Sequence, residues 1–106
     1  MKQVIDEVTR PSLGEEGCQI YHWSQGADDP AWFLLYMEWR DKESFEAHVV
    51  SPHVQKAEQR IEKKKLLTKP AGEWHYYRLL NDNTLRVSVY CLSVSRKIWS
   101  FDSSIA

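Results

Sequence analysis

Residues 31–40 read AWFLLYMEWR, and this stretch decides the fold because it predicts a β-strand with two apolar faces. One face would carry Phe33, Leu35, Met37 and Trp39. The other would carry Trp32, Leu34, Tyr36 and Glu38. A chain of 106 residues can form helices to cover one face of such a sheet, so the other face needs a different cover. We expect a second copy of the same sheet to supply it, which predicts a homodimer.

The residues before this strand predict its partner. Residues 18–24 alternate loosely between apolar and polar side chains, and the turn sequence GADDP at residues 26–30 joins them to residues 31–40. Together these segments predict a β-hairpin.

A helix is predicted at the start of the sequence. Val4, Ile5 and Val8 lie on one helical stripe, which Pro11 and the two glycines after it should end. No strand and no capping Ser, Thr or Asp precedes the stripe, although a helix start normally has such a cap.

Two more helices are predicted after residue 40. Asp41 can cap a helix that begins at Lys42. The dipeptide Ser51-Pro52 then favours a new helix start, because serine suits the N-cap and proline suits the first turn. This second helix should end near Leu67 and direct inward the side chains of Val54, Ala57 and Ile61.

The last part of the sequence predicts a second hairpin. Residues 74–80 form a short aromatic strand, residues 81–84 (NDNT) suit a tight turn, and residues 85–94 form another strand. That strand also has two apolar faces, one with Leu85, Val87, Val89 and Cys91 and the other with Tyr90, Leu92 and Val94. Residues 95–106 are expected to form a loop or a short helix.

The composition indicates one soluble globular domain over residues 1–106, with 42% hydrophobic and 27% charged residues. A net charge of -1 gives no field that would attract nucleic acid or an anionic membrane. The sequence contains no apolar run of the ~20 residues that a membrane span needs, and no secretory signal, so we expect a cytoplasmic protein. Cys18 and Cys91 lack the spacing of a redox or zinc motif and are expected to be free thiols.

Four short motifs together resemble the antibiotic biosynthesis monooxygenase (ABM) family of dimeric α+β-barrel proteins. They are Glu16-Gly17-Cys18 before a strand, the Asp29-Pro30 turn, Met37-Glu38-Trp39 at a strand end, and Ala47-His48 followed by Ser51-Pro52-His53. The resemblance covers roughly residues 1–80 and implies a ferredoxin-like antiparallel sheet with two helices on one face. It also implies that the sheets of two subunits pack face to face.

The sequence departs from the family at its ends, because the family's first strand has no counterpart here. We expect residues 85–94 to occupy the position of that strand, antiparallel to residues 74–80 and parallel to residues 31–40. The sequence then looks like a circular permutation. A truncated gene with an unrelated tail, or a tail exchanged between subunits, remains the alternative.

The resemblance implies a pocket between the sheet and the helices. His48 is the expected catalytic residue, because an imidazole with a pKa of about 6.5 could accept a phenolic proton. Trp39, Tyr36, Phe45 and His53 are the expected substrate-binding residues. The alternatives are that His48 packs at the edge of the core, that Trp39 and Tyr36 pack in the core or a dimer interface, and that His53 lies on the surface.

Two function hypotheses follow. Known members of the family oxidise polycyclic phenols or quinols with O2 without a metal or organic cofactor, so one hypothesis is a cofactor-independent monooxygenase or related enzyme with a small apolar or aromatic substrate. The other is a non-catalytic dimer that binds a small molecule or a protein. Other members degrade haem or isomerise phosphorylated sugars, and fold alone does not identify a substrate.

No metal or haem is expected. His48 and His53 are five residues apart, about 140° around a helix, and the Ser51-Pro52 break separates them further. In ungapped matching, Glu58 stands where the haem-degrading members carry their iron-binding histidine, and a carboxylate is a less suitable haem ligand.

Overall fold

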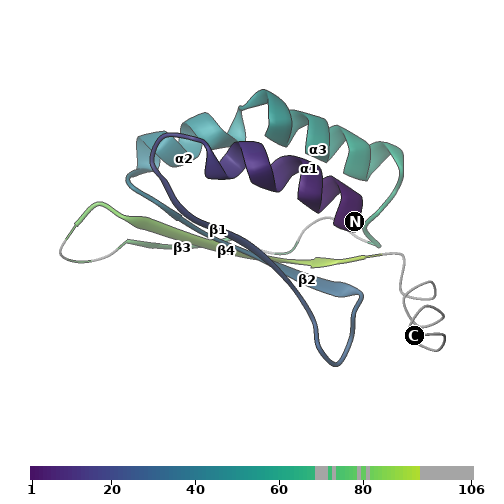
Figure 1. Ribbon diagram of the computed structural model, residues 1–106. Helices are drawn as coiled ribbons and strands as arrows, with labels where there is room; N and C mark the ends of the chain where they lie inside the picture. The colour runs from purple at the N-terminus through teal and green to yellow at the C-terminus, as the bar shows by residue number, and fades with distance from the viewer. Residues whose placement is uncertain (69–71, 73, 79, 81, 94–106) are drawn as a thin grey trace.

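The fold of this chain is an α+β ferredoxin-like arrangement, seen in a computed structural model that describes residues 1–68, 72, 74–78, 80 and 82–93. In this part of the chain three helices lie over one face of a four-stranded antiparallel sheet (Figure 1). Residues 95–106, which were expected to form a loop or short helix, lie outside the described residues, as do Val94 and Asn81.

The predicted first hairpin is confirmed, with strands β1 (Cys18–Gln25) and β2 (Trp32–Trp39). Asp29 shapes the turn between them, because its carbonyl accepts from Trp32 N at 3.1 Å and its side chain accepts from Ala31 N at 3.1 Å. Burial alternates along β2 as the sequence predicts. The buried positions are Phe33, Leu35, Met37 and Trp39.

The second hairpin joins β3 (His75–Arg78) to β4 (Leu85–Leu92), and the strand order is β1-β2-β4-β3. β4 therefore pairs with both expected neighbours. The expected parallel pairing with β2 is wrong, because β4 is antiparallel to both strands. The helices after β2 return the chain across the sheet, so β3 runs in the same direction as β2, and the hairpin then reverses the chain.

Helix α1 (Lys2–Leu13) buries Val4 and Val8, as its stripe predicts. It does not stop at Pro11, because that residue lies in the last turn and removes only one backbone hydrogen-bond donor. The buried Ser12 follows it, and its hydroxyl donates to the carbonyl of Val8 at 2.7 Å.

Helix α2 (Lys42–Val49) begins as predicted, because the Asp41 side chain accepts from Ser44 N at 2.8 Å. Helix α3 (Pro52–Lys63) starts at the predicted break, with Ser51 at its N-cap. It ends before the expected Leu67, because Lys65 adopts a left-handed backbone with φ of 50°.

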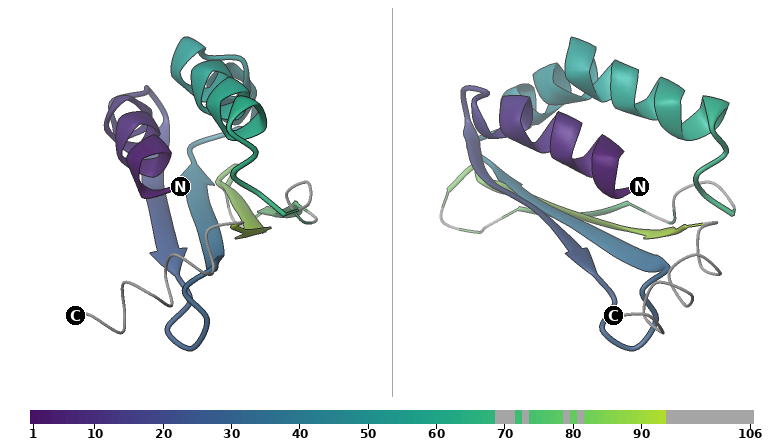
Figure 2. Two further views of the ribbon diagram at one scale, coloured as in Figure 1. Left: turned by 90° about the vertical axis from the view of Figure 1, so that its right-hand side faces the viewer. Right: turned by 45° about the vertical axis from the view of Figure 1, so that its right-hand side comes forward.

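The core lies between the sheet and the helices, and all three helices are on the same side of the sheet (Figure 2). We call the other side the open face; no helix of the described residues covers it. In the same residues, no helix is long and apolar enough to cross a membrane. The core cluster contains Val8, Tyr21, Leu35, Met37, Trp39, Phe45, Val87 and Val89.

Candidate functional site

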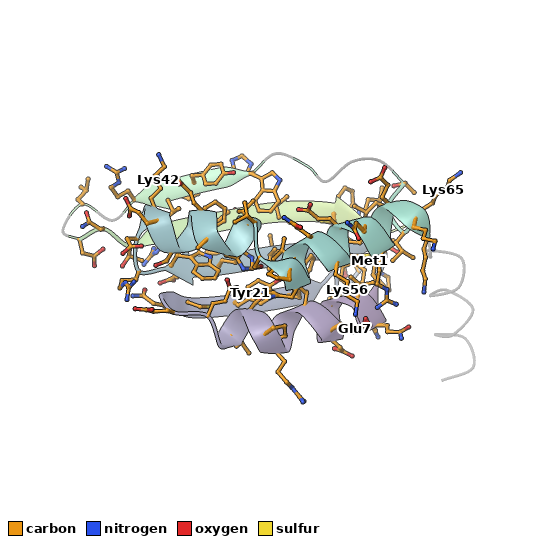
Figure 3. The ribbon with its side chains drawn as sticks, turned by 90° about the horizontal axis from the view of Figure 1, so that it is seen from above. Met1, Glu7, Tyr21, Lys42, Lys56 and Lys65 are labelled. Atoms are coloured by element: carbon orange, nitrogen blue, oxygen red, sulfur yellow. The ribbon has the colours of Figure 1, made fainter. Side chains whose placement is uncertain are left out.

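A cavity of about 680 Å³, here called the main cavity, lies between the helices and the sheet. Its volume is within the usual range for small-molecule sites. Its walls are mostly apolar. The exposed charged side chains of Glu58, Glu62 and Lys65, from the second half of α3 and the turn after it, also line the cavity. Met1 and Lys65 both line it and lie at the same end of the helical layer, opposite Lys42 (Figure 3). The buried residues of its lining are Val4, Val8, Tyr21, Leu35, His48, Val89 and Cys91.

His48 brings an ionisable group to this cavity, although it is only 4% exposed. It lies in the last turn of α2, with its ring centroid 4.6 Å from that of Trp39. The Tyr21 ring approaches it edge-on at 5.6 Å. The aromatic neighbours fix the plane of the imidazole.

Glu15 holds one side of this imidazole. Its Oε2 lies 2.6 Å from His48 Nδ1 and 2.9 Å from His53 Nε2. We call these three residues the Glu15 triad. Because an ionised carboxylate only accepts, Nδ1 of His48 carries the proton and donates, which leaves the Nε2 lone pair for a ligand.

The loop that carries Glu15 is bound against the start of α2. Arg40 N donates to the carbonyl of Gly17 at 2.7 Å. Gly17 has φ of 87°, and a Cβ there would lie 2.3 Å from Ser44 Oγ. Glycine thus allows both the backbone conformation and the close approach that place Glu15 against the helix.

The break between α2 and α3 brings His53 to the same carboxylate. Ser51 Oγ donates to the carbonyl of His48 at 2.6 Å and lies 3.2 Å from His53 Nε2. The ring centroids of His48 and His53 are 5.9 Å apart. The expectation that these two histidines point away from each other is therefore wrong, because the chain turns at Ser51 and the second helix has a new axis.

Burial sets the protonation of the ionisable groups at the cavity. Loss of solvent lowers the pKa of His48 below its ordinary value, against the opposing effect of Glu15. The imidazole is therefore neutral at pH 7. Burial raises the pKa of Cys91 to about 11, so this floor residue remains a thiol. Cys91 and Cys18 are both free, as expected.

The other expected binding residues lie outside the lining of the main cavity. Trp39 is fully buried beneath His48. Tyr36 alternates with the buried residues of β2 and lies on the open face, where its hydroxyl donates to Glu38 at 2.7 Å. Phe45 and His53 line two separate neighbouring cavities, of about 620 and 140 Å³.

The sequence interpretation missed Glu15, Tyr21 and Trp74, and it did not assign Glu58 to the cavity lining. Glu15 lies in a bend, where no periodic pattern marks a functional side chain. The one available signal was its position directly before Glu16-Gly17-Cys18, one of the motifs that carry the family resemblance.

The Glu15 triad also has the composition of a metal site. Two imidazole nitrogens and one carboxylate oxygen lie within 4.8 Å of one another. Histidine and carboxylate ligands suit zinc and other divalent transition metals.

Comparison with known proteins gives one positive finding. A family model described as antibiotic biosynthesis monooxygenase matches residues 2–60, a segment that contains the whole Glu15 triad. No curated protein and no solved structure matches the chain.

Proposed function

Because this chain belongs to the antibiotic biosynthesis monooxygenase family, we propose that it is a monooxygenase-type enzyme that oxidises a phenol- or quinol-like substrate with O2 in the main cavity, without an organic cofactor or metal. The observation that carries the proposal is a neutral imidazole, backed by a carboxylate, in the lining of an apolar cavity. An apolar pocket with few polar groups is typical of small-molecule sites.

His48 is the catalytic base in this proposal. A substrate hydroxyl donates to His48 Nε2, and the neutral imidazole accepts its proton. The Glu15 carboxylate stabilises the imidazolium that forms, at a distance of 2.6 Å. The phenolate that remains is more electron-rich than the phenol and is the form that reacts with O2.

The floor and walls of the cavity suit a flat, apolar ring. Tyr21 and Leu35 line it from the sheet, and Ala57 lines it from α3. Trp23 and Trp74 line it as well. A bound substrate would therefore change tryptophan fluorescence, which gives a binding assay that needs no turnover.

The test is to incubate the protein with a panel of phenols and quinols and to follow O2 consumption and tryptophan fluorescence. Substitution His48→Gln should slow O2 consumption by about a hundredfold or more, since general-base catalysis contributes that much. His75→Gln is the matched control, because His75 is exposed on β3 and does not line the cavity. If ligands bind but none is oxidised, the chain is a binding protein instead.

We infer that the open face packs against a second copy of this chain. Leu34 and Tyr90 pair across β2 and β4 there, next to Tyr36 and Ser88. Tyr90 is 54% exposed, and the neighbouring apolar residues Trp32, Leu34 and Leu92 are half-buried. An apolar sheet face of this kind is typical of an interface between subunits.

The order of the strands supports a circular permutation of the family fold. A ferredoxin-like sheet has the order 4-1-3-2, and β3-β4-β2-β1 reproduces it if β4 takes the place of the first strand. We infer that the strand which opens the family fold follows its last strand in this chain.

A further inference from the structure

We propose that Glu15, His48 and His53 form a binding site for a divalent transition-metal ion, with Zn²⁺ as the probe. The three side chains come from the α1–β1 loop, the end of α2 and the start of α3. Their ligand atoms lie within 4.8 Å of one another. The proposal goes beyond the oxidation described above and does not depend on it.

Two distances within the triad are close to those between ligand atoms of a bound metal ion. Zinc binds nitrogen and oxygen at about 2.0–2.2 Å, so tetrahedral ligand atoms are about 3.3 Å apart. The two contacts of Glu15 Oε2 are 2.6 Å to His48 Nδ1 and 2.9 Å to His53 Nε2. An ion in the middle requires outward shifts of less than about 1 Å.

The surroundings hold the three ligands and leave a route for the ion. Gly17 and Ser51 fix the loop and the helix break, so the ligands are brought together before a metal arrives. The side chains of Glu15 and His53 are 18% and 19% exposed, which opens the site to solvent. Ser51 Oγ, 3.2 Å from His53 Nε2, or a water would complete the coordination.

The ligand types determine which ions should bind. Two imidazoles and one carboxylate favour Zn²⁺ and Co²⁺, whereas Mg²⁺ and Ca²⁺ prefer sites built entirely of oxygen. The ion can bind His48 through Nδ1 only when the single proton of the neutral ring lies on Nε2, so metal binding requires a change of tautomer at this residue.

Metal binding and base catalysis exclude each other at His48. With the ion on Nδ1, the single proton of the neutral ring lies on Nε2, and the ring has no free lone pair for a substrate hydroxyl. The metal-bound protein would then be inactive in the proposed oxidation, and the metal-free protein would be the active form.

The test uses the full chain after treatment with EDTA, titrated with Zn²⁺ by calorimetry and with Co²⁺ by visible absorption, both without substrate. We expect one Zn²⁺ per chain, the intense absorption bands of four-coordinate Co²⁺, and no binding of Mg²⁺. Glu15→Gln and His53→Gln should each weaken Zn²⁺ binding by about a hundredfold or more, and His75→Gln should leave it unchanged.

Two outcomes would overturn the proposal. The first is that the full chain binds no Zn²⁺ in a saturable manner. The second is that His53→Gln, whose folding is verified by circular dichroism, binds Zn²⁺ as tightly as the original chain, which would indicate adventitious binding elsewhere. Failure of the oxidation is distinguishable from either result, since the titrations contain no substrate.

Discussion

At the scale of single residues, the site depends on positions that the sequence does not mark. His48 was identifiable because the family resemblance implies a pocket between the sheet and the helices, and an imidazole there can accept a phenolic proton. Glu15 was not identifiable, because it reaches His48 and His53 only when the loop that carries it folds against α2 at Gly17. His53 was expected at the substrate, and its contact with Glu15 depends on a change of helix axis that residue spacing cannot give.

The conformation of Gly17 leads to a stability prediction. Gly17→Ala should lower the free energy of unfolding by about 1–3 kcal/mol, because alanine at φ of 87° is strained and its Cβ would meet Ser44 Oγ. Urea unfolding measures this loss. The matched control is Gly14→Ala, where φ is -83° and the nearest atom to a Cβ would be 3.6 Å away. Equal stability of the two variants would contradict the argument.

At the scale of helices and strands, the pattern of apolar and polar residues in the sequence was sufficient to predict most elements. Both hairpins follow from alternating apolar residues next to turn sequences, and the start of α2 follows from Asp41. The direction of β4 relative to β2 was predicted wrongly, because alternation identifies the faces of a strand and not its direction. The end of α3 was also missed, because it depends on the backbone of Lys65.

The cap of α2 can be tested by one substitution. Asp41→Ala removes the acceptor for Ser44 N and should lower the free energy of unfolding. Asp41 also pairs with the exposed Arg40, so Arg40→Ala serves as the control for that ion pair. An exposed ion pair contributes little, and we expect the control to change the free energy of unfolding much less than Asp41→Ala does. Urea unfolding with equal losses in both variants would refute the role of the cap.

The central position of β4 leads to a test by truncation. A chain that ends at residue 84 lacks the strand between β2 and β3 and would leave both with unpaired backbone groups. We expect it to be insoluble or unfolded by circular dichroism. A chain that ends at Ser93 retains β4 and is the control; loss of folding there would assign the effect to residues after 93. A folded, soluble chain ending at residue 84 would show that β4 is dispensable.

At the scale of the whole molecule, the two sides of the sheet have different roles. The covered side holds the main cavity and the Glu15 triad, and its residues come from all three helices and from β1, β2 and β4. The open face has apolar side chains and no helix over it in the described residues. A second copy on the open face would leave the helical layer, and with it the rim of the cavity, accessible to substrate.

The proposed dimer predicts that the mass in solution is twice that of the 12.5 kDa chain, measured by light scattering or sedimentation. Leu34→Asp should convert the dimer to a monomer. Leu34 lies on the open face opposite Tyr90, and burying an unpaired carboxylate in an apolar interface is energetically unfavourable. The matched control is Val50→Asp, the same kind of change at a residue that is 65% exposed beyond the end of α2. It should leave the mass unchanged. A monodisperse monomer of the original chain at micromolar concentration would contradict the assembly, and a dimeric Leu34→Asp variant would place the interface on another surface.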